Sequence, residues 1–330
     1  MTGLLLSKGF VAQFGEQLDQ AMQAAGLQPQ IIHLPDDPEQ QLDPTLVAQI
    51  EIAYLTRDLR FTPYYPSFCA AVSAAQQLRW MHFTSAALDQ YPFMDALLAH
   101  KVRLTSSAGT NGVPVGHTAI GGLLMMARGF PRWLQAQREQ RWDPARGAAA
   151  PRDLKGQRII IVGVGTIGAT VAQFCQQLGM TVIGVRRSPR LPADPVDEMI
   201  TLDQLPAYLP GCDWLVLACP DTPETHHLVN AQVLASLPKQ ACLINVARGG
   251  VVDEQALIAA LKQQQIAGAY LDVFATEPLP PDSPLWDMPN VVISPHNAAA
   301  AAGNDGRAAR IFTENMMRYA SGQTMINEQL

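Results

Sequence analysis

The chain has 330 residues, a length typical of about two domains, and 48% of its residues are hydrophobic while 16% are charged. The net charge of −6 is spread along the chain without a run of one sign, which argues against nucleic-acid binding as the main task. The most apolar window, residues 119–126, is shorter than a membrane span. The five cysteines lack metal-binding spacing, which predicts free thiols, no metal site and a cytoplasmic protein.

Short apolar runs alternate with amphipathic stretches along the chain, a pattern typical of α/β folds with mainly parallel sheets. The first hundred residues predict strands at residues 4–6, 30–32, 52–55 and 79–83, and a helix at residues 10–25. A long helix over residues 115–140 and a loop over residues 142–152 follow. The most regular part predicts strand 158–162, helix 167–178 and strand 181–185, with later strands at residues 214–218, 241–246, 268–273 and 291–294. A closing helix from Asn304 is expected to fold back on the first unit.

A glycine-rich turn joins the strand at 158–162 to the helix that follows it. Residues 163–168 read Gly-Val-Gly-Thr-Ile-Gly, which matches the dinucleotide-binding pattern GxGxxG in its required strand-turn-helix context. Gly163 would allow the tight turn, Gly165 the approach of a pyrophosphate, and Gly168 close packing of helix on strand. Free N–H groups near Thr166 and Ile167 would hold the anion. The alternative is a glycine turn without a ligand.

The end of the next strand predicts which dinucleotide binds. An NAD site usually places an acidic residue there to bond the ribose 2′-hydroxyl, but this chain has Arg186, Arg187 and Ser188. Two guanidiniums and a hydroxyl suit a 2′-phosphate. The sequence therefore favours NADP(H), with NAD(H) as the alternative coenzyme, unless both arginines are merely solvated surface charges.

Three side chains that suit hydride transfer to a 2-oxo acid follow strands of the second half. Arg248 can bind a carboxylate in bidentate fashion and polarise the adjacent ketone. His296 can protonate the developing alkoxide, and Glu277 can orient that imidazole and favour its charged form. Parallel strands place such residues at one rim of the sheet, beside the expected nicotinamide.

Each of these residues also has a purely structural interpretation. Glu277 could be a simple loop acid, and Arg248 a structural ion-pair partner. Asp272, at the end of the strand over residues 268–273, would bond the nicotinamide carboxamide or cap the turn.

Several motifs together resemble the D-isomer-specific 2-hydroxyacid dehydrogenases. They are the glycine turn, Pro-Asp-Thr-Pro-Glu-Thr at 220–225, Asn-Val-Ala-Arg-Gly-Gly at 245–250, Leu-Asp-Val-Phe at 271–274 with Glu-Pro at 277–278, and Ser-Pro-His at 294–296. The likeness is dense over residues 104–299 and weaker before them. It implies a flavodoxin-like substrate domain (residues 1–102 and 299–330), a Rossmann NAD(P)-binding domain (residues 103–298), a cleft between them, and a homodimer made largely by the long helix.

The resemblance also implies where the ligands bind. A loop of the first domain, matching residues 84–89, would hold the substrate carboxylate through Ser85, Ala86 and Ala87, although Ala87 stands where glycine is common. Arg57 could be a second anion contact, as in phosphoglycerate-type relatives, or a surface residue. Further coenzyme contacts are expected at five positions that end or follow strands: Cys219, Pro220, Thr225, Val246 and Ala247.

These observations predict an NADPH-preferring reductase of glyoxylate or hydroxypyruvate. Glu277 argues against a formate dehydrogenase, which pairs its histidine with glutamine. Two alternatives stay open: a phosphoglycerate-type dehydrogenase without a regulatory domain, and a non-enzymatic, dinucleotide-sensing interaction protein of the corepressor type.

Overall fold

The computed structural model describes residues 2–85 and 91–329. Its internal contacts divide the chain into two units, residues 1–110 with 301–330 and residues 111–300. The expected boundaries were 102/103 and 298/299. The first lies eight residues later in the structure because the strand at residues 103–106 pairs within the first sheet.

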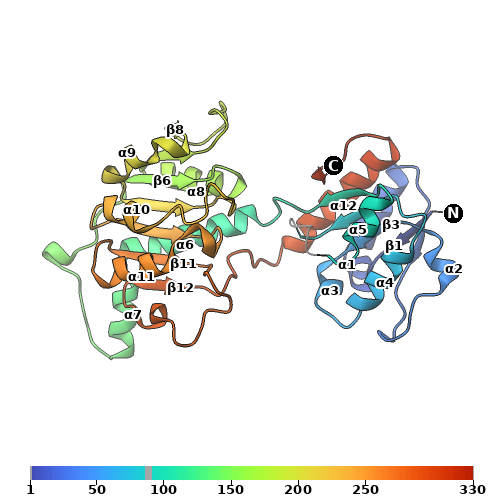
Figure 1. The fold of residues 1–330 in the computed structure, drawn as a ribbon, viewed down its shortest axis with the longest axis horizontal. Helices are drawn as coiled ribbons and strands as arrows, with labels where there is room; N and C mark the ends of the chain where they lie inside the picture. Colours follow the sequence, from blue (N-terminus) through green and yellow to red (C-terminus); the bar gives the residue numbers. More distant parts are fainter. Residues whose placement is uncertain (1, 86–90, 330) are drawn as a thin grey trace. The chain divides into compact units, whose positions relative to one another are not determined.

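The first unit is a doubly wound sheet with helices on both faces (Figure 1). Five parallel strands run in the order β5-β4-β3-β1-β2, the flavodoxin-like order, and a short antiparallel β13 adds to β5. The strands are β1 (Gly3–Leu5), β2 (Gln30–Ile32), β3 (Ile50–Leu55), β4 (Trp80–Phe83), β5 (Arg103–Ser106) and β13 (Glu328–Gln329). The helices are α1 (Lys8–Ala24), α2 (Pro44–Val47), α3 (Arg57–Arg60), α4 (Tyr65–Ala74), α5 (Met94–Ala99) and α12 (Asn304–Ala320).

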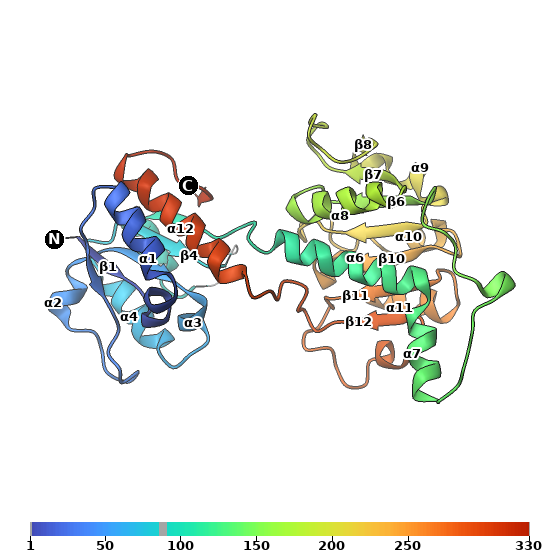
Figure 2. The ribbon, with the colours of Figure 1, turned by 180° about the vertical axis from the view of Figure 1, so that it is seen from behind.

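Alternation along the strands of this sheet builds one core on each face. Leu4 and Leu6 pack with α1 and α12, whereas Leu5 packs with the side of α4 and α5. Figure 2 shows α1 and α12 lying together over one face. Phe312 of α12 stacks on Trp80 and Tyr54, with ring centroids 5.2 and 4.7 Å apart. The end of the chain therefore completes the core that its beginning starts.

The second unit has a seven-stranded parallel sheet in the order β12-β11-β10-β9-β6-β7-β8, which contains the Rossmann order 3-2-1-4-5-6. Its strands are β6 (Arg158–Val162), β7 (Thr181–Val185), β8 (Glu198–Ile200), β9 (Trp214–Leu217), β10 (Cys242–Asn245), β11 (Gly268–Leu271) and β12 (Val291–Ile293). Its α-helices are α6 (Gly112–Arg128), α7 (Phe130–Arg138), α8 (Thr166–Gln177), α9 (Leu205–Tyr208), α10 (Ala231–Ser236) and α11 (Glu254–Lys262). Short 3₁₀ turns lie at Gly147–Ala149, Leu202–Gln204, Leu209–Gly211, Gly249–Val251 and Pro284–Asp287.

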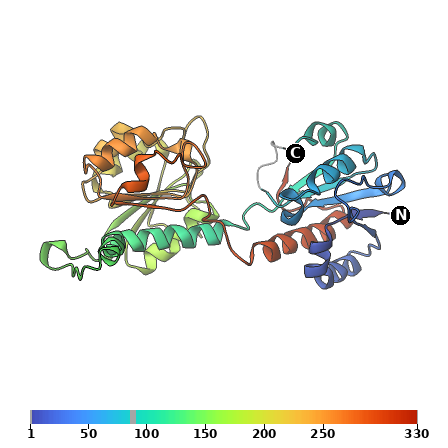
Figure 3. The ribbon, with the colours of Figure 1, turned by 90° about the horizontal axis from the view of Figure 1, so that it is seen from below.

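This sheet also buries a different set of side chains on each face. Ile159 and Ile161 of β6 pack with α6 and α8, while Ile160 and Val162 pack with α9, α10 and α11. Figure 3 shows this sandwich edge-on, with α6 beneath the strands and α11 above them. The continuous apolar run at residues 159–162 is what a parallel strand covered on both sides requires.

The long helix expected over residues 115–140 is two helices in the structure. Gly129 ends α6 in the left-handed region (φ 76°), and Pro131 lies in the first turn of α7.

Helices α6 and α8 pack closely at Gly116. A Cβ on Gly116 would lie 2.6 Å from Thr170 Cγ2, so α6 approaches α8 more closely than a side chain would permit. Within residues 2–85 and 91–329, no helix has the length and apolar character needed to cross a membrane.

Candidate functional site

The glycine turn lies where the strand order of the second sheet reverses, between β6 and β9. Gly163 has φ 95°, and a Cβ there would lie 2.6 Å from the Ala218 carbonyl oxygen, so no other residue fits. A Cβ on Gly168 would collide with the Gly163 carbonyl, whereas one on Gly165 would meet no atom within 4 Å. The turn is therefore closely packed at Gly163 and Gly168 and open at Gly165. The first N–H groups of α8, from Thr166 and Ile167, are placed to hold a pyrophosphate.

A pocket of about 420 Å³ adjoins this turn at the ends of β6, β7 and β9. Seven of the expected coenzyme residues line it: Gly163, Arg186, Arg187, Ser188, Cys219, Pro220 and Thr225. The Cys219 thiol is 8% exposed, and burial raises its pKa to about 11, so it contributes a neutral wall. The dimensions and the donor set fit the nucleotide end of a dinucleotide.

The two arginines at the end of β7 have different surroundings. All five N–H donors of Arg186 are used: two reach the Asp194 carboxylate at 2.6 and 3.0 Å, and three reach backbone carbonyls of Val164, Ser188 and Pro189. Arg187 is exposed and makes no hydrogen bond among the described residues. Arg186 therefore shapes the pocket, and the guanidinium available for a phosphate is that of Arg187.

The sequence analysis assigned no binding role to the other five residues that line this pocket: Val162, Val185, Leu202, Thr222 and Glu224. The Thr222 hydroxyl donates to the Glu224 carboxylate at 2.7 Å and lowers its pKa, and the charge of Arg187 contributes to that lowering. Thr222 and Glu224 belong to the motif at 220–225, so their place in that motif could have identified them as pocket residues.

Glu277 and His296 form a direct pair at the carboxyl end of the same sheet. His296 Nδ1 lies 2.6 Å from Glu277 Oε2, and the side chains are 47% and 34% exposed. The other carboxylate oxygen of Glu277 accepts from the Phe274 N–H at 3.0 Å, which anchors it in its own loop. The imidazole is thus held by Nδ1, and its Nε2 has no hydrogen-bond partner in the part of the chain that the structure describes.

The backbone of His296 is in the left-handed region, with φ 49°, and Asp272 holds it there. The Asp272 carbonyl accepts from the His296 N–H at 2.8 Å, and its carboxylate accepts from the N–H groups of Asn297 and Ala298 and, at 2.5 Å, from the Ser294 hydroxyl. Asp272 is 2% exposed. Of its two expected roles, these contacts are those of a residue that fixes a turn, and the turn is the one that carries His296.

Arg248 lies on a loop whose shape depends on Asn245 and Gly249. The Asn245 amide donates to the Arg248 carbonyl and accepts from the Ala247 N–H, both at 3.1 Å. A side chain on Gly249 would collide with the Phe274 carbonyl, so this loop packs against the one that carries Glu277. Val246 and Ala247 are buried just before it. Arg248 is exposed, bonds the Ala247 carbonyl at 2.7 Å, and has no carboxylate partner among the described residues.

A second histidine–carboxylate pair, which sequence reasoning missed, lies in the loop after β9. His226 Nδ1 is 3.2 Å from Asp221 Oδ1, and a Cβ on Gly250 would be 3.2 Å from the His226 ring. The pair is longer than that of His296, and its loop packs against the Arg248 loop.

The expected substrate residues of the first unit are described in part. Ser85 follows β4 and is half-buried, while Ala86 and Ala87 lie outside the described residues. Arg57 begins α3 and is paired with Asp305 of α12, Nε to Oδ1 3.7 Å. This ion pair joins segments far apart in the sequence.

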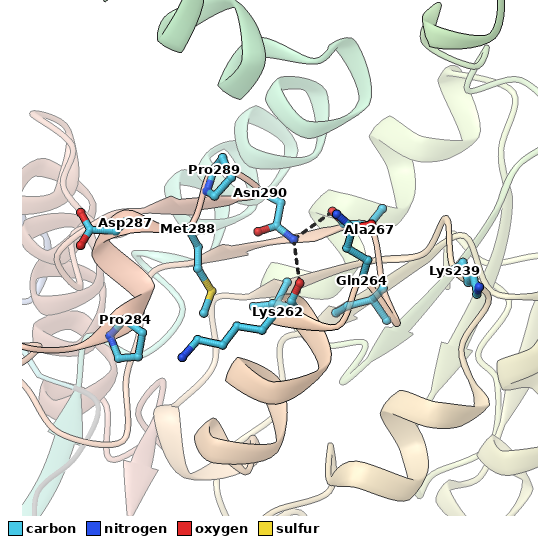
Figure 4. Close-up of a pocket in the computed structure, with 11 residues that line it drawn as sticks. Lys239, Lys262, Gln264, Ala267, Pro284, Asp287, Met288, Pro289 and Asn290 are labelled. Atoms are coloured by element: carbon cyan, nitrogen blue, oxygen red, sulfur yellow. Dashed lines mark hydrogen bonds between the residues drawn. The ribbon is translucent and has the colours of Figure 1, made fainter.

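A larger hollow of about 700 Å³ lies at the opposite edge of the second sheet, where β10, β11 and β12 begin (Figure 4). Lys239, Lys262 and Met288 line it, and the Asn290 amide bonds the carbonyls of Leu261 and Ala267. None of the expected site residues lines this hollow. In the described parts of the chain, no three His, Cys, Asp or Glu side chains gather as metal ligands.

Comparisons with known proteins identify the family of this chain. The family "D-isomer specific 2-hydroxyacid dehydrogenase, NAD binding domain" matches residues 120–298. A glyoxylate reductase of Korarchaeum cryptofilum is 37% identical over 184 residues, 54% of this chain and 54% of its own length. A D-3-phosphoglycerate dehydrogenase of Methanocaldococcus jannaschii is 29% identical over 71% of this chain and 44% of its own length. The aligned part of this chain therefore spans about half the length of these curated relatives.

Solved structures are similar over the whole chain, and one of them holds a coenzyme. It is a D-isomer specific 2-hydroxyacid dehydrogenase of Xanthobacter autotrophicus in complex with NADPH and MES, with a TM-score of 0.72 and 32% identity, covering 100% of this chain and 98% of the other.

Proposed function

The chain belongs to the D-isomer-specific 2-hydroxyacid dehydrogenase family, and from that premise we propose that it reduces small 2-oxo acids with a nicotinamide dinucleotide, preferring NADPH. One observation carries the proposal. The carboxyl edge of the second sheet carries a directly paired His296 and Glu277 beside a loop whose arginine, Arg248, has no carboxylate partner among the described residues.

Three side chains would divide the work on the substrate. Arg248 binds the carboxylate of the 2-oxo acid through paired N–H donors and polarises the neighbouring carbonyl. His296 donates its Nε2 proton to the carbonyl oxygen as negative charge develops there. Glu277 accepts from Nδ1, which orients the ring. Bound NADPH supplies the hydride in this reaction.

Asp272 would act through His296 rather than on the substrate. Its carboxylate and carbonyl hold the turn at residues 294–298, and with it the left-handed backbone of the histidine. The other expected role was a bond to the nicotinamide carboxamide, and the contacts of Asp272 with this turn support the positioning role instead.

The coenzyme preference rests on Arg187 and Ser188. Both line the nucleotide pocket, and the end of β7 offers no acidic residue. One feature favours NAD(H) as the second candidate: the Glu224 carboxylate lines the same pocket and could accept from a ribose 2′-hydroxyl. For NADPH to be preferred, the attraction of Arg187 for the 2′-phosphate must exceed the repulsion of that phosphate by Glu224.

Two further properties are proposed with the activity. The first is a homodimer formed through α6, α7 and the segment that follows α7 up to residue 152. Exposed apolar side chains gather there: Phe130 (43%), Trp133 (37%), Leu134 (42%) and Trp142 (94%). Sedimentation of the purified protein tests it, and a monomer at micromolar concentration would contradict it. The second is a cytoplasmic location, in keeping with five unpaired cysteines.

A panel of 2-oxo acids assayed with both coenzymes tests the function. We expect turnover of glyoxylate and hydroxypyruvate, with kcat/KM about tenfold or more higher for NADPH than for NADH, because a charge-assisted contact to the 2′-phosphate contributes about 1.5–3 kcal/mol. Preference for 3-phosphohydroxypyruvate would instead support the phosphoglycerate-type alternative. Tight dinucleotide binding without turnover of any 2-oxo acid would support the corepressor-type interaction protein.

A further inference from the structure

The first unit has its own small pocket of about 120 Å³ at the carboxyl ends of β1, β3 and β4. Parallel sheets bind ligands at this edge. The lining includes Gln13, Thr56 and Thr84, and Thr84 begins the loop expected to hold the substrate carboxylate. The pocket is therefore continuous along the chain with that expected substrate loop, and its volume suits a group of a few heavy atoms.

The charges of this pocket are dominated by carboxylates. Arg57 is its guanidinium, and two acids line the same space, Asp58 and Asp305. Asp58 accepts from the Ser7 hydroxyl at 3.0 Å, and Asp305 reaches Arg57 at 3.7 Å. Arg57 and Asp305 are 46% and 48% exposed, so the pair lies at the solvent-facing side of the pocket. The pocket has a negative formal charge, which disfavours a second anionic group.

Uncharged polar groups complete the lining. Thr56 is 4% exposed, and its Oγ1 has no hydrogen-bond partner among the described residues. The Thr84 hydroxyl donates to the Leu55 carbonyl at 3.0 Å, which leaves its oxygen able to accept. A buried hydroxyl without a partner is satisfied when a ligand supplies one.

We propose that Asp305 is a specificity-determining residue that acts by pairing with Arg57. The pair excludes from this pocket a substrate that carries a phosphate or a second carboxylate, and admits one that carries only a hydrogen atom or a hydroxyl group there. The inference rests on the proposed function and names its substrate class. Accepted substrates are 2-oxo acids with one anionic group, such as glyoxylate and hydroxypyruvate. Phosphorylated and dicarboxylic 2-oxo acids, such as 3-phosphohydroxypyruvate and oxaloacetate, are disfavoured.

The substitution Asp305→Asn tests the proposal, with Asp19→Asn as the matched control. Asp19 is an exposed acid of α1 in the same unit, so both variants remove one negative charge. We expect D305N to lower KM for 3-phosphohydroxypyruvate relative to KM for hydroxypyruvate about fivefold or more, and D19N to leave that ratio unchanged. The gain should shrink in high salt and disappear in the double variant R57A/D305N.

A second measurement does not need turnover. Inorganic phosphate should raise the melting temperature of D305N more than that of the wild type, D19N or R57A/D305N. Equal effects in D305N and D19N, or a gain that persists without Arg57, would overturn the role of Asp305. A wild type that reduces no 2-oxo acid would refute the proposed function instead, and the phosphate measurement would still decide the inference.

Discussion

The carboxyl edges of the two sheets both carry an arginine where an anion is expected to bind, but the two arginines differ in their partners. Arg248 on the second sheet has no carboxylate partner among the described residues, whereas Arg57 on the first is paired with Asp305. The residue type alone suggests the same role for both. The partner distinguishes a guanidinium that can bind an anion from one that is already neutralised.

The same comparison holds for other charged residues of the second unit. Arg187 is available to a ligand, whereas the neighbouring Arg186 has all its donors in use. His296 and His226 each face a carboxylate, but only the former is fixed by a buried aspartate at its own backbone among the contacts described here.

The largest effect is expected from His296→Asn. It removes the proton donor, so kcat should fall about 10²–10⁴-fold with little change in NADPH binding. His226→Asn is the matched control, since it removes the second exposed histidine–carboxylate pair. Steady-state rates and coenzyme titrations of both variants provide the test, and similar losses in the two would contradict the assignment of His296.

Arg248→Ala should act mainly on substrate binding. Loss of charge-assisted hydrogen bonds to the carboxylate should raise KM for the 2-oxo acid about 10–100-fold. Arg248→Lys should restore little of this, because an ammonium cannot form the bidentate contact. An unchanged KM in R248A would show that another group binds the carboxylate.

Arg187→Ala should separate the coenzymes. We expect KM for NADPH to rise about tenfold, the lower end for a lost charge-assisted contact, while KM for NADH stays within about twofold. Arg190→Ala is the control, because Arg190 is exposed nearby but does not line the pocket. A parallel loss for both coenzymes in R187A would argue against a contact with the 2′-phosphate.

An effect on stability rather than on kinetics is expected from a buried histidine of the first sheet. His82 is fully buried between the hydroxyls of Thr105 and Ser107, at 2.6 and 3.0 Å, and burial lowers its pKa to about 3. The unfolded chain binds a proton there near pH 6.5, so the contribution of His82 to stability is complete above that pH and is lost as pH falls toward 3. The loss is about 1.4 kcal/mol per pH unit at most.

Urea unfolding between pH 7 and 4 measures this loss. His82→Gln keeps hydrogen-bonding capacity without the titration, so its free energy of unfolding should fall less steeply over this range than that of the wild type. Parallel slopes for the two proteins would contradict the account.

Local patterns predicted much of the second unit. The glycine turn, the apolar strands and the polar residues that follow them are each encoded within a few residues. The pairing of Glu277 with His296 could be predicted because parallel strands bring their carboxyl ends to one edge. Even the break at Gly129 had a local signal, the proline two residues later.

The partners that decide roles could not be predicted, because they come from distant or irregular segments. Asp305 reaches Arg57 only after α12 folds back on the first sheet. Asp194 captures Arg186 from a loop without periodicity. Asp272 had two acceptable roles in the sequence, and the contacts of its carboxylate with the turn after β12 support the role of fixing that turn.

The discontinuous first unit also has a consequence for biosynthesis. Phe312 and Met316 of α12 belong to the buried core around Trp80, so that core is incomplete while the ribosome makes residues 111–300. At about 5–20 residues per second, this interval lasts roughly 10–40 s. Throughout it, the part of that sheet face which α12 covers in the folded unit lacks its cover, and a chaperone can bind there.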